Sequence, residues 1–376
     1  MKVAIVHDWL VNYGGGERVV EQMLALYPDA DIYTLVYDKK KMASHFPPEK
    51  VHTSFLQKFP RATKLYTKFL KFMPKAFESF DLSGYDLVLA SSSSCAKGVI
   101  TAPMVPYLAY IHTPMRYAWD LYFDYLKRSG LLTRFFMKRW IPGIRQWDYL
   151  SSQRIDTVVC NSRYIARRIQ KFWRREASVI HPPVDTERLS PNGKPSEDFY
   201  VVFSRFVSYK RNDIAIRACG ELGRTLIVIG SGSEEKHLKS LAASYNTVSI
   251  TFTGRLPDEK VADYLQRCKA LIFCAEEDFG IIPVEAQACG RPVIAYGKGG
   301  ALETVIDGQT GIFFDRQDSD SLKKALLRFE GLAAQGTFDA QRITSHAQQF
   351  SAARFRAELQ ERIDETIRSV RGSVSL

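Results

Sequence analysis

ALIFCAEEDFGIIPVEAQACGRPVIAY, residues 270–296, is the stretch that decides the fold of this chain of 376 residues. Its first part, 270–275, is apolar and ends at charge, which is typical of a buried strand. Pro283 can occupy the first position of a helix, where its missing N–H costs nothing, and Gly290 can end that helix. Residues 291–296 then begin a second strand, so the stretch predicts a βαβ unit of a parallel sheet.

Two carboxylates flank the junction between the first strand and the helix. Glu277 follows the carboxyl end of the strand, and Glu285 falls seven intervening residues later, in the expected first turn of the helix. Ligands of open α/β sheets bind at that end of the strands. Carboxylates accept hydrogen bonds from diols, and the backbone N–H groups of Phe279, Gly280 and Ile281 can donate to hydroxyls. The stretch therefore suits a sugar or a ribose, although a solvated loop Glu and a helix-start Glu favoured by the helix dipole would give the same spacing.

The segment EDFGIIPVEAQACGRPVIA, with Glu277 and Glu285 at the two ends of its E-x7-E pattern, resembles the EX7E motif of retaining, GT-B-type glycosyltransferases of the large family 4 group. The resemblance covers nearly the whole chain. It implies an α/β fold of two Rossmann-like, doubly wound domains, with an inter-domain cleft that holds the ligands. Two other classes stay open, a sugar-nucleotide epimerase with the same two-domain build and a non-catalytic sugar-binding protein.

Apolar strands alternate with helical segments along the chain in two series, which favours two parallel sheets. A segment rich in proline, serine and charge, 182–198, is the candidate boundary. We expect an acceptor-binding domain over 1–190 and a nucleotide-sugar-binding domain over 196–350, and the resemblance implies that a helix over 352–376 crosses back to brace the first domain. The expected strands are 2–7, 32–36, 87–90, 107–112, 157–160, 177–181, 199–203, 225–229, 248–253, 270–275, 292–296 and 311–314.

Composition limits the possible classes of protein. The length suggests about two domains. The chain has 52 Lys and Arg against 41 Asp and Glu, and the resulting net charge of +11 favours an anionic partner. The sequence begins directly with a strand-like run and holds no apolar run of membrane-spanning length, so we expect a cytoplasmic protein without a signal peptide. The six cysteines form no CxxC pair and indicate reduced, buried thiols.

Cations follow the first strand of the second series, in YVVFSRFVSYKRND, residues 200–213. Arg205 and Lys210 near the start of a helix suit a diphosphate, because cations and helix N-termini both stabilise phosphate. The segment resembles the G-R-x4-K-G element of the family, whose Arg and Lys hold the nucleotide diphosphate. Ser204 and Arg211 stand where the family has glycine, so we expect a less flexible loop. Basic loop residues that are merely solvated are the alternative.

Two segments of the first half add candidate ligand contacts. The turn VHDWLVNYGGGERVV, residues 6–20, resembles the glycine-rich loop of the family, and Gly15 and Gly16 would offer N–H groups to the donor phosphate or the acceptor. His112 ends a strand in YIHTPMRYAWD and corresponds to a family histidine that reaches the transferred sugar. HTPMRYAW resembles bacterial mannosyltransferases that build lipid-linked polysaccharides. A plain turn and a structural histidine are the alternatives, and the role of His7 stays open.

In the second half, the backbone of Gly254, Arg255 and Leu256 is the expected surface for base recognition. The glycine-containing run 228–238 lacks the third glycine of a dinucleotide fingerprint, and in this family it lines the nucleotide pocket. Two D-x-D triplets, 29–31 and 318–320, precede a strand and a helix, where Asp is a good cap. We therefore expect no metal and no cofactor, since Arg205 and Lys210 can neutralise the diphosphate.

Two basic segments interleaved with aromatics, 57–77 and 126–147, suit the interface of an anionic membrane. An amphipathic helix with its aromatics in the core is the alternative. Nucleic acid is disfavoured because no recognisable RNA- or DNA-binding module is present. A lipid-linked acceptor would explain a peripheral contact with the inner face of the cytoplasmic membrane.

Together these features imply a retaining hexosyltransferase that moves a hexose, preferentially mannose from GDP-mannose, onto a lipid-linked or polysaccharide acceptor through an α-linkage. In the roles that the resemblance implies, Arg205 and Lys210 stabilise the leaving diphosphate, and Glu277 orients the sugar. Glu285 accepts from the ribose diol, and His112 contacts the sugar. The family mechanism is a same-face displacement without a protein nucleophile. A UDP-hexose donor is the nearest alternative.

Overall fold

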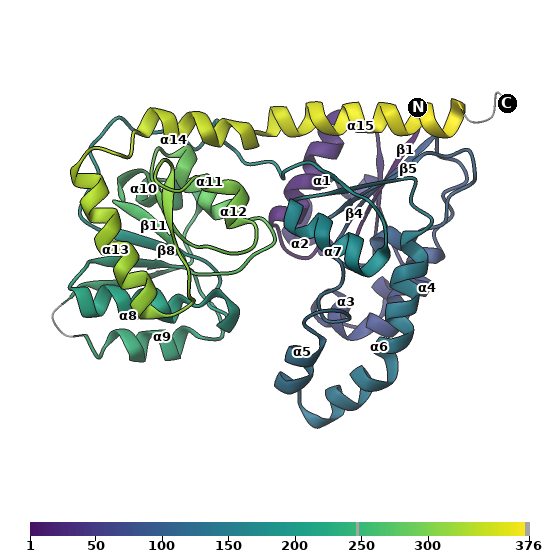
Figure 1. Ribbon diagram of the computed structural model, residues 1–376. Coiled ribbons are helices and arrows are strands. Elements are labelled where there is room, and N and C mark those ends of the chain that lie inside the picture. The colour runs from purple at the N-terminus through teal and green to yellow at the C-terminus, as the bar shows by residue number, and fades with distance from the viewer. Residues whose placement is uncertain (246–247, 373–376) are drawn as a thin grey trace. The chain divides into compact units, whose positions relative to one another are not determined.

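The computed structural model describes residues 1–245 and 248–372. Contacts within the chain divide it into two compact units. Unit 1 contains residues 1–183 and the C-terminal residues from 355 on, and unit 2 contains residues 184–354. Each unit is an α/β structure built on one parallel sheet (Figure 1).

Unit 1 holds a seven-stranded sheet in the order β3-β2-β1-β4-β5-β6-β7, and all of its strand pairs are parallel. Its central strand β1 is buried at every position, which explains its continuous apolar sequence. The sequence analysis missed the short edge strand β3. The strands are β1 (Val3–His7), β2 (Asp31–Thr34), β3 (Val51–Thr53), β4 (Leu87–Ser92), β5 (Tyr107–Ile111), β6 (Thr157–Cys160) and β7 (Ser178–Val179).

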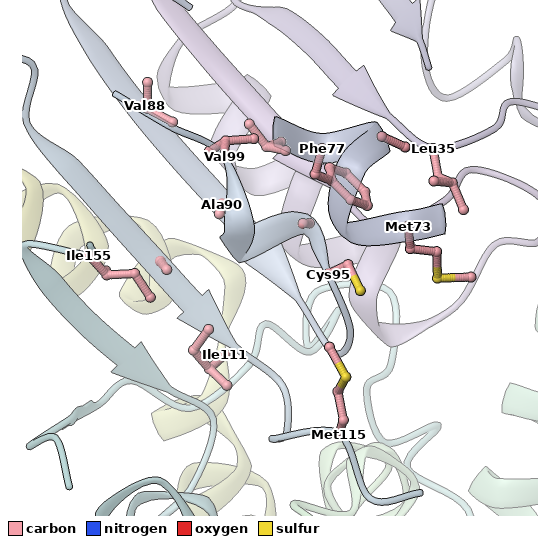
Figure 2. Packing of buried hydrophobic residues seen from close by; sticks show 14 of the residues in the cluster. Leu35, Met73, Phe77, Val88, Ala90, Cys95, Val99, Ile111, Met115 and Ile155 are labelled. Carbon is pink, nitrogen blue, oxygen red and sulfur yellow. The ribbon is translucent and has the colours of Figure 1, made fainter. Parts of the chain in front are cut away.

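Helices cover both faces of this sheet. One hydrophobic cluster contains residues of α1 and α15, and the other contains residues of α4, α6 and α7. Figure 2 shows side chains of the second cluster, including Phe77 of α4, Ala90 of β4 and Ile111 of β5. The helices are α1 (Gly15–Leu26), α2 (Lys39–Met42), α3 (Ala62–Leu65), α4 (Met73–Glu78), α5 (Tyr122–Arg128), α6 (Leu131–Ser152), α7 (Arg163–Trp173) and α15 (Ala352–Gly372), with 3₁₀ helices η1 (Pro48–Lys50), η2 (Phe55–Lys58), η3 (Tyr66–Phe72) and η4 (Ala96–Gly98).

The C-terminal helix α15 packs on unit 1. Phe355, Leu359 and Ile363 recur along one face of the helix and are buried in the cluster that contains Ile5 of β1 and Val19 of α1. Spacings of four residues place such side chains on one stripe of a helix, which explains how α15 covers this face.

Unit 2 holds a six-stranded parallel sheet in the order β10-β9-β8-β11-β12-β13, again with helices on both faces. Its strands are β8 (Tyr200–Phe203), β9 (Leu226–Ile229), β10 (Ile250–Gly254), β11 (Ala270–Phe273), β12 (Val293–Tyr296) and β13 (Gly311–Phe314). Its helices are α8 (Asn212–Leu222), α9 (Glu235–Ala242), α10 (Asp258–Arg267), α11 (Ile281–Ala288), α12 (Ala301–Thr304), α13 (Ser319–Ala334) and α14 (Ala340–Ala347), with 3₁₀ helices η5 (Ser208–Lys210) and η6 (Gln348–Phe350).

Two expected helix starts are wrong. Helix α11 begins at Ile281, because Gly280 adopts a left-handed conformation with φ of 90° and serves as the N-cap. Pro283 is therefore the third residue of the helix and not the first, and Glu285 lies in the second turn and not the first. Helix α1 begins at Gly15, so Gly15 and Gly16, which the sequence analysis placed in a turn, form the start of the helix.

The strand orders create one topological switch point in each sheet, between β1 and β4 in unit 1 and between β8 and β11 in unit 2. The carboxyl edges at these points are where open α/β sheets bind ligands. In unit 1 this edge carries His7, Ser91 and, after β5, His112. In unit 2 the loops that follow β8 and β11 there carry Arg205 and Glu277.

Candidate functional site

The loop between β8 and α8 holds the predicted cationic pair of unit 2. The buried Ser204 bonds through Oγ to the side chain of Asn212 at 3.0 Å, which ties the loop to the first residue of α8. Arg211 takes a left-handed conformation with φ of 52° at the position where the family has glycine. Its guanidinium donates to both carboxylate oxygens of Asp213, at 3.1 and 3.2 Å. These bonds hold Arg211 in a left-handed backbone conformation that residues other than glycine rarely adopt.

Lys210 and Glu277, which the sequence proposed for a diphosphate and a sugar, contact each other. Lys210 Nζ forms an ion pair with Glu277 Oε1, and the two side chains are only 10% and 21% exposed. Arg205 is exposed, and its Nη2 bonds the hydroxyl of Tyr209 at 3.3 Å. The carboxyl edge of this sheet thus presents a positive loop next to a carboxylate.

The start of α11 supplies the other predicted groups of unit 2. Phe279 is buried and anchors the loop in the core, while Gly280 turns the chain into the helix. Backbone N–H groups in the first turn of a helix have no intrahelical acceptor, and Ile281 lies at this end of α11. Glu285 follows one turn later and is 6% exposed.

Two glycines that the sequence analysis did not select support the Glu277 loop. Gly300 donates its N–H to the carbonyl of Glu277 at 2.8 Å. A Cβ on Gly299 would lie 2.3 Å from that carbonyl oxygen, and one on Gly300 would lie 2.2 Å from Cα of Phe279. Only glycine allows the two backbone segments to come this close. The Gly299–Gly300 pair after β12 was therefore the sequence signal that could have predicted this contact with the Glu277 loop.

The predicted wall of the nucleotide pocket lies on the neighbouring strands. Gly230 follows β9 with φ of 135°, and its N–H donates to the carbonyl of Gly254 at 2.9 Å. A Cβ on Gly230 would lie 1.9 Å from the carbonyl oxygen of Ser204, so this glycine allows the loops after β8 and β9 to touch. Beyond Gly254, Arg255 is exposed and Leu256 is half-buried.

In unit 1 the structure brings Gly16 and His112 together. A Cβ on Gly16 would lie 3.6 Å from Nε2 of His112 and 3.5 Å from Cε1 of His7. Gly15 and Gly16 form the first turn of α1, so their N–H groups have no acceptor within the helix. Ser91 bonds both rings, with Oγ 2.8 Å from Nε2 of His112 and 3.1 Å from Nδ1 of His7.

The two histidines have opposite pKa shifts. Burial lowers the pKa of His7, but the hydrogen bond and charge of Glu17 and the charge of Asp8 outweigh it, so the pKa is raised. Burial and the neighbouring His7 lower the pKa of His112 to about 3. Near neutral pH, His112 is therefore a neutral ring. The sequence analysis left His7 open and missed Glu17, which contacts His7 from α1, and Ser91, which the pairing of β4 with β1 and β5 brings to both histidines.

The structure assigns structural roles to the two D-x-D triplets. Asp318 caps α13 by accepting from the N–H of Ser321 at 2.8 Å. Asp31 accepts from the hydroxyl of Tyr85 at 2.7 Å. Within residues 1–245 and 248–372, no group of three or more His, Cys, Asp or Glu side chains could hold a metal ion.

The two basic, aromatic segments adjoin within unit 1. Segment 57–77 is not a single amphipathic helix, because it forms η2, α3, η3 and α4 in succession. The ammonium of Lys71 in η3 lies 5.5 Å from the ring centre of Trp140 in α6. Helix α5 and the first half of α6 extend away from the sheet (Figure 1). No helix in the described ranges is long and apolar enough to cross a membrane.

Comparison with known protein families identifies two adjoining matches. The model "Glycosyltransferase Family 4" matches residues 13–188, and the model "Glycosyl transferases group 1" matches residues 185–335. The two matches therefore cover most of both units.

Similar proteins carry related descriptions. An uncharacterized glycosyltransferase of Methanocaldococcus jannaschii is 26% identical over 328 residues, which covers 87% of this chain and 88% of that protein. The GDP-mannose-dependent α-(1-6)-phosphatidylinositol monomannoside mannosyltransferase of Mycolicibacterium smegmatis is 32% identical over 200 residues. That alignment covers 46% of this chain and about half, 52%, of the mannosyltransferase.

Among solved structures, Anabaena HepE in complex with UDP superposes with a TM-score of 0.70 and 18% identity, covering 97% of this chain and all of the other. At this identity the likeness concerns the fold alone. The two parallel sheets, the matching pair of family models and the similar proteins agree, and the chain belongs to the family 4-type glycosyltransferases with the two-domain, Rossmann-like GT-B fold.

Proposed function

We propose that this glycosyltransferase moves mannose from GDP-mannose to a lipid-linked or polysaccharide acceptor, with retention of the anomeric configuration and an α-linkage. The observation that carries the proposal is the Lys210–Glu277 ion pair at the switch point of the second sheet, with Arg205 on the same loop as Lys210. Opposite charges next to each other suit a donor with an anionic diphosphate on one side and a hydroxyl-rich sugar on the other. The description of the mycobacterial relative supports GDP-mannose as the donor.

Arg205 and Lys210 bind the diphosphate and stabilise its charge as the glycosidic bond breaks, which is the main electrostatic demand of the reaction. Glu277 accepts hydrogen bonds from sugar hydroxyls, and Glu285 accepts from the ribose diol. The N–H groups of Phe279, Gly280 and Ile281 donate to the donor. The departing phosphate oxygen takes the acceptor proton on the same face of the sugar, and no metal or other cofactor takes part.

In unit 1, His112 contacts the sugar, while Gly15 and Gly16 offer N–H groups to the donor phosphate or the acceptor. The backbone of Gly254, Arg255 and Leu256 recognises the base. A UDP-hexose donor is the second candidate, because the HepE structure was solved with UDP.

We also propose that unit 1 makes a peripheral contact with the anionic inner face of the cytoplasmic membrane through 126–147 and the adjoining 57–77. The contact centres on the start of α6, where Leu131, Leu132 and Phe135 are 84%, 71% and 62% exposed. Basic residues among these apolar side chains suit anionic headgroups. In 57–77, Phe59 and Phe72 are exposed, whereas other aromatics of the segment pack partly against the core, so this segment adds mainly positive charge.

A panel of GDP-mannose, GDP-glucose, UDP-glucose and UDP-N-acetylglucosamine tests the donor by calorimetric titration. We expect GDP-mannose to bind most tightly, and preference for a UDP-sugar would replace the proposed donor. Incubation with donor alone separates transfer from epimerisation, because an epimerase would release a new nucleotide-sugar without any acceptor. Proton NMR of the transfer product then reports the anomeric configuration, and a β-linkage would contradict retention.

A further inference from the structure

His112 is held by a hydroxyl whose proton can be located from its surroundings. Ser91 Oγ lies 2.8 Å from Nε2 of His112, a distance that fits a hydrogen bond in either direction. A neutral imidazole has one N–H and one acceptor nitrogen. The direction of this bond therefore determines which nitrogen of His112 carries the proton.

His7 decides the direction. Its Nδ1 lies 3.1 Å from the backbone carbonyl oxygen of Ser91 and 3.1 Å from Ser91 Oγ. A carbonyl oxygen can only accept, so Nδ1 of His7 carries a hydrogen. On the other side of the ring, Nε2 lies 3.5 Å from Oε1 of Glu17, and this carboxylate favours a fully protonated His7. Ser91 therefore cannot donate its hydroxyl proton to His7.

One acceptor is left for that proton. Ser91 is fully buried, and among residues 1–245 and 248–372 its Oγ has no hydrogen-bonding side-chain neighbour except the nitrogens of His7 and His112. If His112 donated from Nε2, the hydroxyl hydrogen would have no acceptor, which is unfavourable for a buried polar group. We propose that Ser91, oriented by His7, donates to Nε2 of His112, so that His112 carries its proton on Nδ1.

This arrangement makes His112 a hydrogen-bond donor toward a ligand. Its Nδ1 has no hydrogen bond within residues 1–245 and 248–372, and the ring is half-buried. The backbone holds the ring in place, because the N–H of His112 donates to the carbonyl of Ser92 and its carbonyl accepts from Asn161 Nδ2. Resting on the proposed function, we assign the Nδ1–H to an oxygen of the transferred sugar. Ser91 and His7 are positioning residues.

Nitrogen NMR of the full chain tests the proton position directly. The protein is labelled with ¹⁵N at its seven histidines, and the His112 signals are assigned by their loss in His112→Asn. We expect a protonated Nδ1 and an unprotonated Nε2 at pH 7. A protonated Nε2 would overturn the proposal. This measurement needs no substrate, so it stands apart from the proposed donor and reaction.

Three variants test the role of the arrangement. In Ser91→Ala the Nε2 of His112 loses its donor, and we expect its signals to shift toward a mixture of tautomers and kcat to fall about 10-fold. Ser92→Ala is the matched control, because this side chain bonds Asp8 instead, and its His112 signals should not move. His112→Asn keeps an N–H near the Nδ1 position, whereas His112→Asp offers only acceptors. Equal kcat in the Asn and Asp variants would contradict the donor role, even if the tautomer were as proposed.

Discussion

Lys210 and Glu277 neutralise each other at the carboxyl edge of the second sheet, although each is proposed to serve a different part of the donor. Both side chains are mostly buried, so loss of one removes the ion-pair partner of a charge that is poorly solvated. The ion pair therefore holds the two proposed ligand-binding groups in place in the absence of a ligand, and it makes each of them sensitive to substitution.

Replacement of Lys210 by alanine should lower kcat/KM for the donor by about 100-fold, because it removes a cation that we propose stabilises the leaving diphosphate. Steady-state kinetics with a saturating acceptor measure this effect. Lys324→Ala, which removes an exposed cation of α13, is the control and should leave the rate unchanged. Activity of Lys210→Ala within about twofold of the parent protein would remove Lys210 from the diphosphate site.

Replacement of Glu285 by glutamine should weaken GDP binding about tenfold, because the carboxylate that we propose accepts from the ribose diol becomes a neutral amide. Inorganic pyrophosphate has no ribose, so its affinity should not change. Arg205→Ala should weaken the binding of both GDP and pyrophosphate. Calorimetric titration measures the affinity of each variant for GDP and for pyrophosphate. If Glu285→Gln lost the same affinity for both ligands, Glu285 would not contact the ribose.

Exchange of Leu131 and Leu132 for glutamate should lower the partition coefficient for anionic vesicles about tenfold or more. The exchange removes exposed apolar area and adds negative charge that the vesicle surface repels. The two positions begin α6, where acidic residues are favoured by the helix dipole, so the fold should survive. Sedimentation with phosphatidylglycerol vesicles measures the binding.

The control is Leu302→Glu with Leu327→Glu, which alters two exposed leucines of unit 2. This double variant should sediment like the parent protein. Equal loss in both double variants, or binding that persists in Leu131→Glu with Leu132→Glu, would contradict a membrane contact at the start of α6.

His112 should make the protein less stable in acid. Its pKa of about 3 in the folded state lies below the ordinary 6.5, so between these values the unfolded chain binds the extra proton. The free energy of unfolding therefore falls as pH falls from 6.5 toward 3, by at most about 1.4 kcal/mol per pH unit from this group. Urea titrations at pH 6, 5 and 4 should show that the free energy of unfolding of His112→Asn falls less with decreasing pH than that of the parent protein. The same pH dependence in both proteins would contradict the lowered pKa of His112.

His7 should act in the opposite direction. Its pKa is raised in the folded state, so its stabilisation is complete below pH 6.5 and is lost as pH rises through the folded value. His7→Gln should accordingly lose less stability than the parent protein between pH 6.5 and 9, as judged by urea titration. The groups that face this ring are Glu17, Asp8, Ser91 and His112.

The buried pair Lys97 and Asp148 should be essential for the stability of unit 1. Their charged atoms are 2.9 Å apart, and Asp148 Oδ2 also accepts from the ring N–H groups of Trp119 and Trp173, at 2.7 Å each. Asp148→Asn removes the countercharge of the buried Lys97 and should lower the free energy of unfolding by about 3–5 kcal/mol.

Denaturation followed by tryptophan fluorescence measures the loss. The control breaks an exposed pair in the same way, since Glu235→Gln removes the partner of Lys239 in α9 and should cost under about 1 kcal/mol. Equal stabilities of Asp148→Asn and Glu235→Gln would show that the buried pair contributes no more than a surface one.

Most strands of both sheets were predictable because the interior strands of a parallel sheet are buried on both faces and are therefore continuous apolar runs. Such a run can be recognised without knowing which strands lie beside it. Strand β3, Val51–Thr53, was missed because it is short and incompletely buried at the edge of the sheet. The start of α11 was misplaced because the rule for proline at the first helical position ignores Gly280, whose left-handed backbone begins the helix earlier.

The sequence by itself determined the two-sheet architecture and the family, because hydrophobic runs and the motif around Glu277 are local in the chain. It could not determine which side chains meet. The bonds from Ser91 to His7 bridge 84 residues, and Lys210 reaches Glu277 from a different strand end. These pairs exist because β1 lies beside β4 and β8 beside β11, an order that is set by the packing of the whole sheet.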